Sequence, residues 1–414
     1  MEPVRDLAAR LGNPHLGRVT VHVTGTKGKG SVAALVAAGL RAAGLRTGVY
    51  TSPHVERITE RVLVPGPTGP LGPLGPIGDE AFADALERVL DAQDGACSGP
   101  EGAAIEGRAQ AADGASWFDL VSLAAFVAFR AAGLEAQVIE VGLGGRLDST
   151  NIVQPDVAVV TNVDLEHTAL LGTTRAAIAS EKAGILKPGA PVVSGMPAGD
   201  EAGDVVLARA RELGILTRLE PPRAGEPIAE RNLRLARATL DLLGARGVAG
   251  GAGATIAGSL LDAGLARAAA LPGRMELRAA GATPVLFDGA HVASSLALVV
   301  DEALADPRLG AGERGRRPVT VVAVHHEKDV ARLLAPLARL GGPVLCTTLP
   351  TGVHRSAEEV AEAARAIGLA AEPWPEPSEA LRAALAGGAP WVLVTGSLYV
   401  VGALRPLTAP WPAP

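Results

Sequence analysis

One stretch near the start of the chain combines the residue types that bind phosphate. An alternating apolar run over residues 19–23 leads directly into Thr24-Gly-Thr-Lys-Gly-Lys-Gly-Ser31. Glycines let backbone N–H groups approach phosphate oxygens, Lys29 supplies a positive charge, and Ser31 can open a helix and bind Mg²⁺. The pattern predicts a nucleoside triphosphate site made by Gly25, Thr26, Lys27, Gly28, Lys29, Gly30 and Ser31.

The spacing of this loop differs by one residue from the common P-loop, because Gly30 separates Lys29 from Ser31. The loop therefore leaves the reaction open. A tight turn with incidental lysines is the alternative interpretation. It is disfavoured because an alternating strand precedes the loop and an Ala/Leu/Val-rich helix over residues 32–43 follows it.

Polar side chains also follow three other predicted strands, in Thr51-Ser-Pro-His54, Glu140-Val-Gly-Leu-Gly-Gly-Arg-Leu-Asp148 and Thr161-Asn-Val-Asp-Leu-Glu-His167. Open α/β sheets bind ligands at the carboxyl ends of their strands, so these groups and Ser31 can hold Mg²⁺ with water and phosphate oxygens. Each also has a purely structural interpretation, as a turn former (Ser52), a buried paired acid (Glu140) or a helix cap or core histidine (His167).

The elements that must position these groups alternate between strands and helices. Predicted strands cover residues 18–23, 48–51, 136–141, 156–161 and 191–193, and a second series covers residues 283–287, 319–324, 344–347 and 391–395. This alternation predicts an α/β fold with parallel sheets and crossover helices. A Gly/Ala-rich connection over residues 244–258 separates the two series, and we place the domain boundary at 279/280.

Composition excludes several classes of protein. The 414 residues are 48% hydrophobic and carry a net charge of −6, so they suit large buried cores and give no basic footprint for nucleic acid. Cys97 and Cys346 are the only cysteines, and their separation predicts neither a disulfide framework nor a zinc site. No apolar signal core or membrane-spanning run occurs, so we expect a cytoplasmic protein without nucleic-acid or membrane partners.

Two inserts carry little chemical information. Residues 66–78 repeat Gly-Pro-x and are predicted to form an extended surface loop, because the repeat is far too short for a collagen helix. Residues 94–116 are rich in Gly and Ala and are predicted to be another loop, after a helix over residues 79–93.

Seven ordered motifs resemble those of folylpolyglutamate synthases, which belong to the Mur ligase superfamily. They are Thr24-Gly-Thr-Lys-Gly-Lys-Gly-Ser31, Tyr50-Thr-Ser-Pro-His54, Glu140-Val-Gly-Leu-Gly-Gly-Arg-Leu-Asp-Ser-Thr-Asn151, Glu181-Lys-Ala-Gly-Ile-Leu-Lys-Pro-Gly189, Pro272-Gly-Arg274, Asp288-Gly-Ala-His291 and Val394-Thr-Gly-Ser-Leu-Tyr399. The resemblance implies a P-loop central domain with a parallel-rich sheet flanked by helices (residues 1–279). It also implies a smaller Rossmann-like C-terminal α/β domain (residues 280–414).

The resemblance implies an ATP-dependent ligase that adds L-glutamate to the γ-carboxylate of a folate. A carboxylate has no leaving group, so it first attacks the γ-phosphate of ATP to give an acyl phosphate and ADP. The amine of glutamate then displaces phosphate. Both steps build negative charge on oxygen, which Lys29, the loop N–H groups and Mg²⁺ would stabilise.

The resemblance also assigns roles residue by residue. It implies catalytic roles for Lys29, Lys182 and His167, with Lys182 resembling a carbamylated lysine, and it implies Mg²⁺ ligands at Ser31, Ser52, Glu140 and His167. Carbamylation makes physical sense because an ammonium beside Mg²⁺ is repelled, whereas the carbamate is an anion. A solvated helix lysine is the structural alternative for Lys182.

The remaining implied contacts concern the three substrates. Adenine, phosphate and ribose contacts fall on Asn232, Arg274 and Asp288; glutamate contacts fall on His291, Lys328 and Ser397; folate contacts fall on Trp117, Phe118, Leu147 and Ser149. An aromatic pair such as Trp117-Phe118 can stack on a flat pterin, and core packing is the equally weighted alternative. Strand-end polar residues can equally be caps or turn formers.

The chain departs from the family pattern in two places. Val292-Ala293 stand where many members have Asn-Pro, so any role of that asparagine is lost or moved. Only 18 residues precede the predicted P-loop strand, where bacterial relatives often have a longer segment that helps to build the pterin pocket. We therefore expect folylpolyglutamate synthesis as the main activity, dihydropteroate as a poor substrate, and a monomer.

Several alternatives stay open. A bifunctional or dedicated dihydrofolate synthase would join glutamate to dihydropteroate, and a non-catalytic ATP-binding protein would need the loop without the other motifs. A cell-wall Mur ligase would need an additional nucleotide-sugar domain, and a P-loop motor or kinase would need the usual loop spacing. The pair His325-His326 is interpreted as incidental, since only Glu327 and Asp329 lie nearby in the sequence as further ligands.

Overall fold

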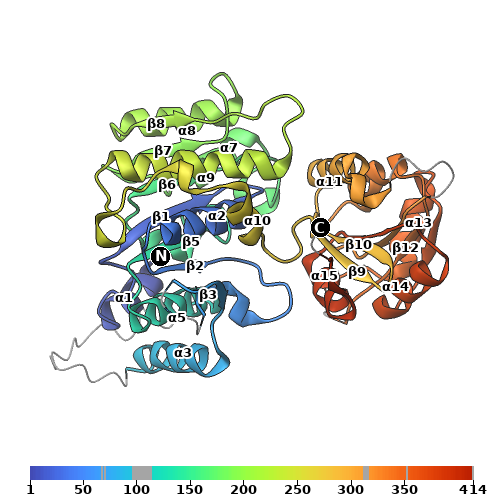
Figure 1. The fold of residues 1–414 in the computed structure, drawn as a ribbon, viewed down its shortest axis with the longest axis horizontal. Coiled ribbons are helices and arrows are strands. Elements are labelled where there is room, and N and C mark those ends of the chain that lie inside the picture. Colours follow the sequence, from blue (N-terminus) through green and yellow to red (C-terminus); the bar gives the residue numbers. More distant parts are fainter. Residues whose placement is uncertain (67–68, 70, 96–113, 311–316, 351–352, 413–414) are drawn as a thin grey trace. The chain divides into compact units, whose positions relative to one another are not determined.

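The structure is a computed structural model that describes residues 1–66, 69, 71–95, 114–310, 317–350 and 353–412. The chain forms two compact units, Met1–Ala270 and Leu271–Pro414 (Figure 1). The sequence places the division at 279/280, whereas the units divide at 270/271. The difference arises because β9 (Glu276–Ala280) pairs antiparallel with β10 (Thr283–Phe287) and so belongs to the second sheet.

The first unit is built on an eight-stranded sheet with the order β4-β3-β2-β5-β1-β6-β7-β8. Every pair of neighbouring strands is parallel except β2–β3 and β3–β4, which are antiparallel. The five strands predicted for this unit are confirmed to within two residues. The strands are β1 (Val19–Thr24), β2 (Thr47–Tyr50), β3 (Val62–Pro65), β4 (Leu74–Pro76), β5 (Ala136–Glu140), β6 (Val157–Val160), β7 (Val192–Ser194) and β8 (Thr217–Leu219).

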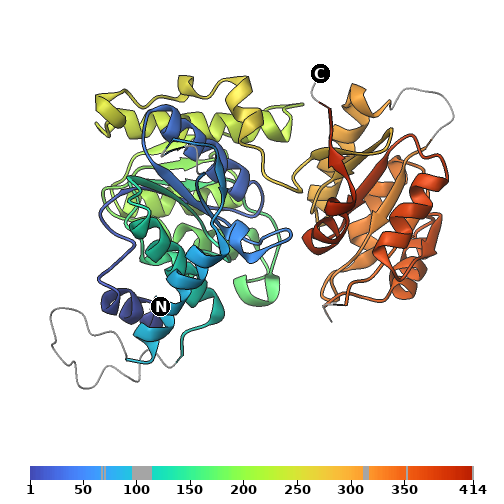
Figure 2. The same cartoon turned by 60° about the horizontal axis from the view of Figure 1, so that its bottom comes forward.

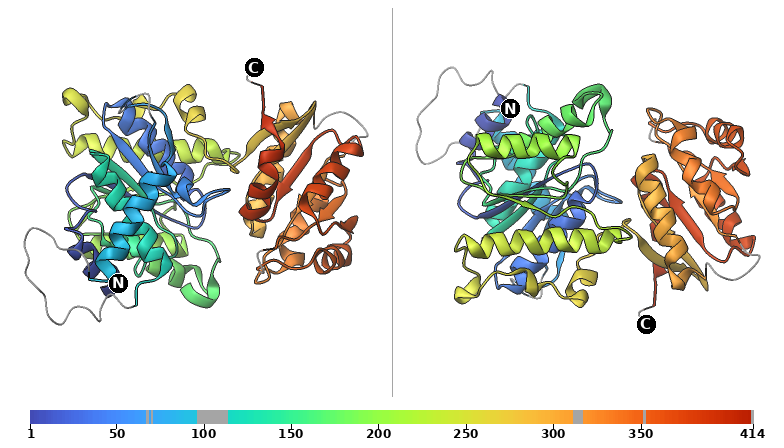
Figure 3. Two further views of the ribbon diagram at one scale, coloured as in Figure 1. Left: turned by 90° about the horizontal axis from the view of Figure 1, so that it is seen from below. Right: turned by 90° about the horizontal axis from the view of Figure 1, so that it is seen from above.

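Helices cover both faces of the first sheet. They are α1 (Glu2–Arg10), α2 (Lys29–Ala42), α3 (Asp79–Gln93), α5 (Trp117–Ala131), α6 (Thr168–Leu171), α7 (Arg175–Ala183), α8 (Glu201–Glu212), α9 (Ile228–Ala245) and α10 (Ala263–Ala268). Successive strand residues face opposite sides, so Val157 and Val159 pack with α2 and α9, whereas Ala158 and Val160 pack with α7 and α8. Figure 3 shows α9 and α8 on opposite sides of this sheet.

The second unit contains a seven-stranded sheet with the order β13-β12-β11-β14-β10-β9-β15. The five strands β13, β12, β11, β14 and β10 are parallel to one another. β9 pairs antiparallel with β10, and β15 pairs antiparallel with β9 at the edge of the sheet (Figure 2). The remaining strands are β11 (Val319–Val322), β12 (Val344–Cys346), β13 (Ala371–Pro373), β14 (Val392–Thr395) and β15 (Ala409–Pro410). The helices are α11 (Ala293–Ala305), α12 (Val330–Leu334), α13 (Ala357–Ala366), α14 (Pro377–Ala386) and α15 (Leu398–Leu404).

The predicted inserts are only partly described. Within residues 66–78, Leu74–Pro76 form the edge strand β4 against β3, so this segment is not wholly a surface loop. The predicted helix over residues 79–93 is confirmed as α3. Most of the predicted loop over residues 94–116, and Cys97 within it, lie outside the described residues. Across the described ranges, none of the helices has the length and apolar character needed to cross a bilayer.

Candidate functional site

The predicted phosphate loop connects β1 to α2 at the carboxyl end of the first sheet. Gly25 has φ 149° and Gly28, which caps the helix, has φ 80°, both within the range that favours glycine. A Cβ on Gly25 would lie 1.9 Å from Thr161 Oγ1, so no larger residue fits there without a shift. The loop therefore brings backbone N–H groups to the N-terminus of a 14-residue helix, an arrangement that binds anions.

Two residues after β6 brace this loop. Thr161 Oγ1 donates to the Lys27 carbonyl at 2.6 Å, and Asn162 Nδ2 donates to the same oxygen at 3.0 Å. Lys27 N–H donates to Asn162 Oδ1 at 2.8 Å. Sequence reasoning included both residues in a segment that could hold Mg²⁺, but it did not predict that they shape the loop. Their contacts hold the loop in shape before any ligand arrives.

Lysines of the loop are held by nearby acceptors. Lys29 Nζ donates to the Thr26 carbonyl at 3.4 Å, and Lys27 Nζ forms an ion pair with Glu166 Oε1 at 3.1 Å. Glu166 is buried, whereas Lys27 is partly exposed. The loop therefore combines a cation held to its own backbone with a cation held by a neighbouring carboxylate.

Lys182 reaches the loop from α7. Its side chain is buried, and Nζ donates to the Gly25 carbonyl at 2.9 Å. Burial, followed by the charges of Lys29 and Lys27, lowers the pKa of Lys182 to about 7, while the Glu166 carboxylate opposes this shift. A substantial neutral fraction of this amine therefore exists at pH 7. A solvated helix lysine, the structural alternative, does not fit these contacts.

Glu140 and Ser52 are brought together because β2 pairs in parallel with β5. Glu140 is buried, and its Oε2 accepts from Ser52 N–H at 3.1 Å and from the Thr51 hydroxyl. Thr51 was not among the predicted site residues. One carboxylate oxygen thus orders the turn after β2, so the structural interpretation of Glu140 as a paired acid also holds.

His167 lies at the start of α6 with φ 51°, and its side chain is exposed. Its Nε2 is 4.0 Å from Glu166 Oε1. Over the ranges that the structure describes, no three His, Cys, Asp or Glu side chains lie close enough to hold a metal ion. A cation at the predicted ligands would therefore take hydroxyl, phosphate or water oxygens for most of its shell. Such a donor set fits Mg²⁺, which usually keeps several waters.

Asn232, on α9, lies against the loop. It is buried, and a Cβ on Gly28 would be 2.7 Å from its Oδ1. Its neighbour Arg231 donates from Nη2 to the Thr161 carbonyl at 3.3 Å, a contact that sequence reasoning missed. α9 therefore covers one side of the phosphate loop and places Asn232 next to it, as expected for a residue that contacts a nucleotide.

The four predicted folate residues differ in exposure. Trp117 is 53% exposed at the start of α5, with the Arg61 guanidinium 5.0 Å from its ring centroid, and Leu147 is also exposed. Phe118 packs against Tyr50, with ring centroids 6.1 Å apart. Ser149 is buried. Trp117 and Leu147 are thus available to a ligand, whereas Phe118 contributes to the core.

In the second unit, Asp288 follows β10 and orders its own turn. Its Oδ2 accepts from Met275 N–H at 2.9 Å and its Oδ1 from Ala290 N–H at 2.8 Å. This carboxylate therefore ties the Pro272-Gly-Arg274 motif to the end of β10. Arg274 Nη1 donates to the Gly273 carbonyl at 3.2 Å. α11 begins at Ala293 without a side-chain cap, at the position of the Val292-Ala293 departure.

The three predicted glutamate residues follow β10, β11 and β14, which are neighbouring strands. His291 Nδ1 is 2.9 Å from the Gly289 carbonyl oxygen, and Lys328 follows β11 in a turn. Ser397 caps α15 and its Oγ lies 3.0 Å from His354 Nε2. His354 was not predicted, since it follows the loop after β12 and has no motif of its own.

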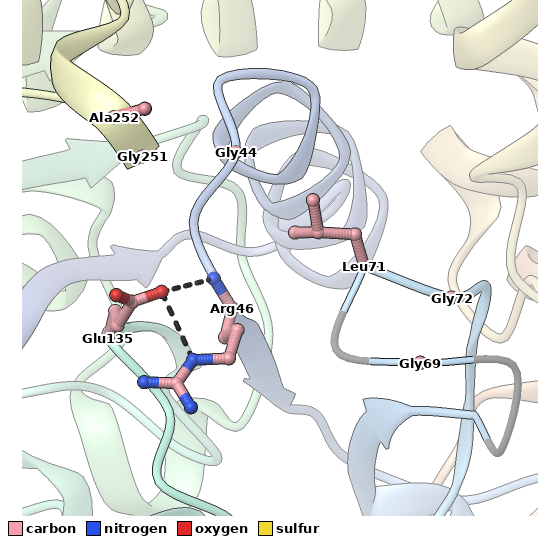
Figure 4. Close-up of a pocket in the computed structure, with 8 residues that line it drawn as sticks. All are labelled: Gly44, Arg46, Gly69, Leu71, Gly72, Glu135, Gly251 and Ala252. Carbon is pink, nitrogen blue, oxygen red and sulfur yellow. Dashed lines mark hydrogen bonds and ion pairs between the residues drawn. The ribbon is translucent and has the colours of Figure 1, made fainter.

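A separate pocket lies at the opposite edge of the first sheet (Figure 4). Arg46 and Glu135 precede β2 and β5, and their side chains pair at 3.2 Å. The lining residues are Gly44, Arg46, Gly69, Leu71, Gly72, Glu135, Gly251 and Ala252. Because its charges neutralise each other and it lies at the amino ends of these strands, this pocket is not part of the candidate site.

Comparisons with known proteins identify relatives of this chain. The chain is 31% identical over 374 residues to the dihydrofolate synthase/folylpolyglutamate synthase of Escherichia coli, covering 87% of this chain and 80% of that relative. It is 33% identical over 435 residues to a probable bifunctional folylpolyglutamate synthase/dihydropteroate synthase of Haloferax volcanii. That match covers 98% of this chain and 48% of the relative, so the chain spans about half of the haloarchaeal protein's length.

Two solved structures share the fold. E. coli FolC in complex with DHPP and ADP has a TM-score of 0.77 and 28% identity, covering 98% of this chain and 92% of that chain. The bifunctional folylpolyglutamate synthase/dihydrofolate synthase of Yersinia pestis, complexed with AMPPNP and Mn ion, has a TM-score of 0.75 and 26% identity, covering 98% and 93%. No family model matches the sequence.

Proposed function

Because this chain belongs to the folylpolyglutamate synthase/dihydrofolate synthase family, we propose that it is an ATP-dependent ligase that adds L-glutamate to the γ-carboxylate of a folate. The contact between Lys182 Nζ and the Gly25 carbonyl carries this proposal most directly. It joins two motifs that are far apart in the sequence at one phosphate loop. A simple ATP-binding protein has no need of a buried amine at that place.

The reaction proceeds in two steps. A carboxylate oxygen of the folate attacks the γ-phosphorus of ATP, the bond to the β,γ-bridging oxygen breaks, and an acyl phosphate and ADP form. The neutral amine of glutamate then attacks the acyl carbon, the C–O bond to phosphate breaks, and an amide forms. The amine loses its proton during this step, and phosphate leaves.

The chain's own residues supply positioning and charge for the first step. The N-terminus of α2 directs N–H groups toward the phosphates, and Lys29 adds a positive charge beside them. Asn232, against the loop, is proposed to contact the adenine. These groups stabilise the negative charge of the transferring phosphoryl group without a covalent enzyme intermediate.

Mg²⁺ is proposed to bind at Ser31, Ser52, Glu140 and His167, with water and phosphate oxygens completing its shell. When bound, the cation neutralises charge on the phosphates. The Y. pestis relative, complexed with AMPPNP and Mn ion, supports the inclusion of a divalent cation in this proposal. Glu140 is suited to the role because its buried carboxylate is already oriented by Ser52 N–H.

Lys182 is proposed to carry a carbamate. Its neutral amine attacks carbon dioxide, an N–C bond forms and a proton leaves, so a buried cation becomes an anion. The lowered pKa favours this reaction because only the neutral amine is a nucleophile. The anion would also relieve the repulsion among Lys27, Lys29 and Lys182.

The incoming glutamate is proposed to bind at the carboxyl edge of the second sheet, through His291, Lys328 and Ser397. Its two carboxylates need donors, and Lys328 offers a cation. Arg274 and Asp288 are proposed to contact the phosphates and the ribose. Trp117 and Leu147 are proposed to contact the folate, because both are exposed.

A second candidate activity joins glutamate to dihydropteroate. The E. coli relative, named for both activities, and the solved complex of FolC with DHPP favour testing it. One centre can serve both acceptors, because only the molecule that presents the carboxylate differs. We keep folylpolyglutamate synthesis as the main activity.

The test is acceptor-dependent ADP release by purified protein with ATP, Mg²⁺ and glutamate. We expect release only when glutamate and a reduced monoglutamyl folate are both present, with the product heavier by one glutamyl residue. Comparing kcat/KM with dihydropteroate ranks the two activities. ADP release that ignores both acceptor and glutamate would indicate an ATP hydrolase, and no ADP release with any acceptor would indicate a non-catalytic ATP-binding protein.

A further inference from the structure

Four histidines follow the parallel strands of the second sheet. His291 follows β10, His325 and His326 follow β11, and His354 lies after β12. The His325 and His326 rings stack with centroids 4.4 Å apart, and the His325 and His354 centroids are 6.0 Å apart. A backbone bridge between His325 and His354 joins the two loops. The pair interpreted as incidental from the sequence is therefore part of a larger imidazole cluster.

A metal site does not explain this cluster. Three imidazoles are a common ligand set for zinc, but they must converge on one ion at about 2 Å each. Within the part of the chain that the structure describes, no three His, Cys, Asp or Glu side chains meet that need. The cluster must therefore be interpreted through its hydrogen bonds.

One of those bonds reaches Ser397. Ser397 is buried and its Oγ accepts from Tyr399 N–H at 3.1 Å, while His354 Nε2 lies 3.0 Å from the same oxygen. A hydroxyl has one proton and two acceptor positions. Two of these three are used, so one remains for a ligand. The hydrogen bond to His354 therefore fixes the direction of the one Ser397 proton or lone pair that is left for a ligand.

The ring itself is held in place. Tyr399 packs against His354 edge-on, with centroids 5.6 Å apart and planes at 83°. Burial, followed by the neighbouring imidazoles of His325 and His326, lowers the pKa of His354 to about 4. The ring is therefore neutral at pH 7 and can exchange a hydrogen bond with a hydroxyl in either direction.

We propose that His354 is a positioning residue for the amino-acid substrate, holding the Ser397 hydroxyl in the orientation that contacts the incoming glutamate. This inference rests on the proposed function, which places Ser397 in the glutamate subsite. If His354 Nε2 accepts the hydroxyl proton, Ser397 keeps a lone pair for the substrate ammonium. If it donates, Ser397 keeps its proton for a substrate carboxylate.

The experiment compares kinetic constants of single variants. His354→Phe keeps an aromatic ring against Tyr399 and loses the hydrogen bond, so KM for glutamate should rise about 10-fold while KM for ATP is unchanged. His354→Gln retains a donor and an acceptor and should recover most of the loss. His326→Phe is the matched control, because this exposed ring bonds to the Val353 carbonyl and not to Ser397, and it should behave as wild type.

A double-mutant cycle with Ser397→Ala tests the route of the effect. Once the hydroxyl is gone, His354→Phe should raise KM for glutamate no further. The proposal is overturned if His354→Phe has the same effect with and without the hydroxyl, or if His326→Phe matches it. If His354→Phe does not fold, His354→Asn, which is too short for this bond, takes its place in the cycle.

The wild-type enzyme separates this inference from the proposed function. If its ADP release does not depend on glutamate, both fail together. If release depends on glutamate and the two substitutions act independently, only the role of His354 fails.

Discussion

The two sheets of this protein present different chemistry at their carboxyl edges. The first edge gathers buried or half-buried charges, with Lys182 held to the Gly25 carbonyl and Lys27 paired with Glu166. The second edge gathers imidazoles and a hydroxyl, joined by the bond between His354 and Ser397. Under the proposed function, fixed charge would serve phosphoryl transfer, and neutral hydrogen bonds, together with Lys328, would serve amino-acid recognition.

The two edges also differ in how tightly they are braced. A Cβ at Gly25 would meet Thr161 Oγ1, whose hydrogen bond to the Lys27 carbonyl prevents it from moving freely. A Cβ at Gly289 would also clash, with Leu398 Cδ2 at 2.3 Å and Cγ at 2.5 Å, but Gly289, unlike Gly25, does not have a positive φ. The phosphate edge is therefore the less tolerant of the two.

The largest contrast is expected between the lysines of the two edges. Lys29→Ala should lower kcat by about two to four orders of magnitude with the fold intact, because it removes charge from the transition state. Lys328→Ala should instead raise KM for glutamate by about 10-fold. Circular dichroism checks the fold of both variants, single-turnover ADP release checks Lys29→Ala, and steady-state product formation at varied glutamate concentration checks Lys328→Ala. A folded Lys29→Ala variant with near-normal rates would remove this lysine from the mechanism.

Lys182→Ala tests whether the first edge needs an anion or a cation. We expect a loss of about two orders of magnitude in kcat, with partial recovery when a small carboxylic acid fills the vacated space. In the wild type, activation by added bicarbonate should increase as pH rises through about 7, since the neutral amine is the reactive form. A nucleotide-bound crystal with an unmodified lysine directed into solvent would contradict the carbamate.

Gly25→Ala tests the bracing of the first edge. The strain of a non-glycine residue at φ 149° and the clash with Thr161 should lower the free energy of unfolding by about 3 kcal/mol and weaken ATP binding. Gly289→Ala should cost about 1 kcal/mol. Gly78→Ala is the control, because a Cβ there meets nothing within 4 Å. If urea unfolding shows that both substitutions lower the free energy of unfolding equally, the two edges do not differ in their tolerance of a larger residue.

The smallest expected effect concerns stability in acid. Burial, followed by the charge of Lys187, lowers the pKa of His22 on β1 to about 3, whereas an unfolded imidazole titrates near its ordinary value. Unfolding therefore takes up a proton as pH falls from about 6.5 toward 3, and stability declines by up to about 1.4 kcal/mol per pH unit for this group.

His22→Gln removes this titration while keeping a polar partner for Thr150, which lies 3.0 Å from His22 Nε2. Urea midpoints at pH 7 and pH 5 should fall less in this variant than in wild type. His354→Gln should reduce the slope by a similar amount over this range, because the pKa of His354 is also lowered, to about 4, which is below pH 5. An unchanged slope in His22→Gln would mean that this imidazole does not control acid stability.

Local patterns in the sequence predicted much of the fold. The parallel strands of both series, the phosphate loop and α3 are encoded by short-range periodicity and by glycine spacing, which act within a few residues. The strands at or next to the sheet edges were missed, namely β3, β4, β8, β9, β13 and β15. Such strands have little periodicity of their own and form only because a neighbouring strand offers hydrogen bonds.

The chemistry of the site depended on contacts that no local pattern carries. Lys182 contacts Gly25, which lies 157 residues earlier in the sequence. Thr161 and Asn162 hydrogen-bond to Lys27, which precedes them by more than 130 residues. His354, after β12, hydrogen-bonds to Ser397, after β14, although β11 lies between these two strands in the sheet. The sequence alone determined which groups lie at strand ends. Strand order and register decided which of them meet, because only the assembled sheets bring distant strand ends to one edge.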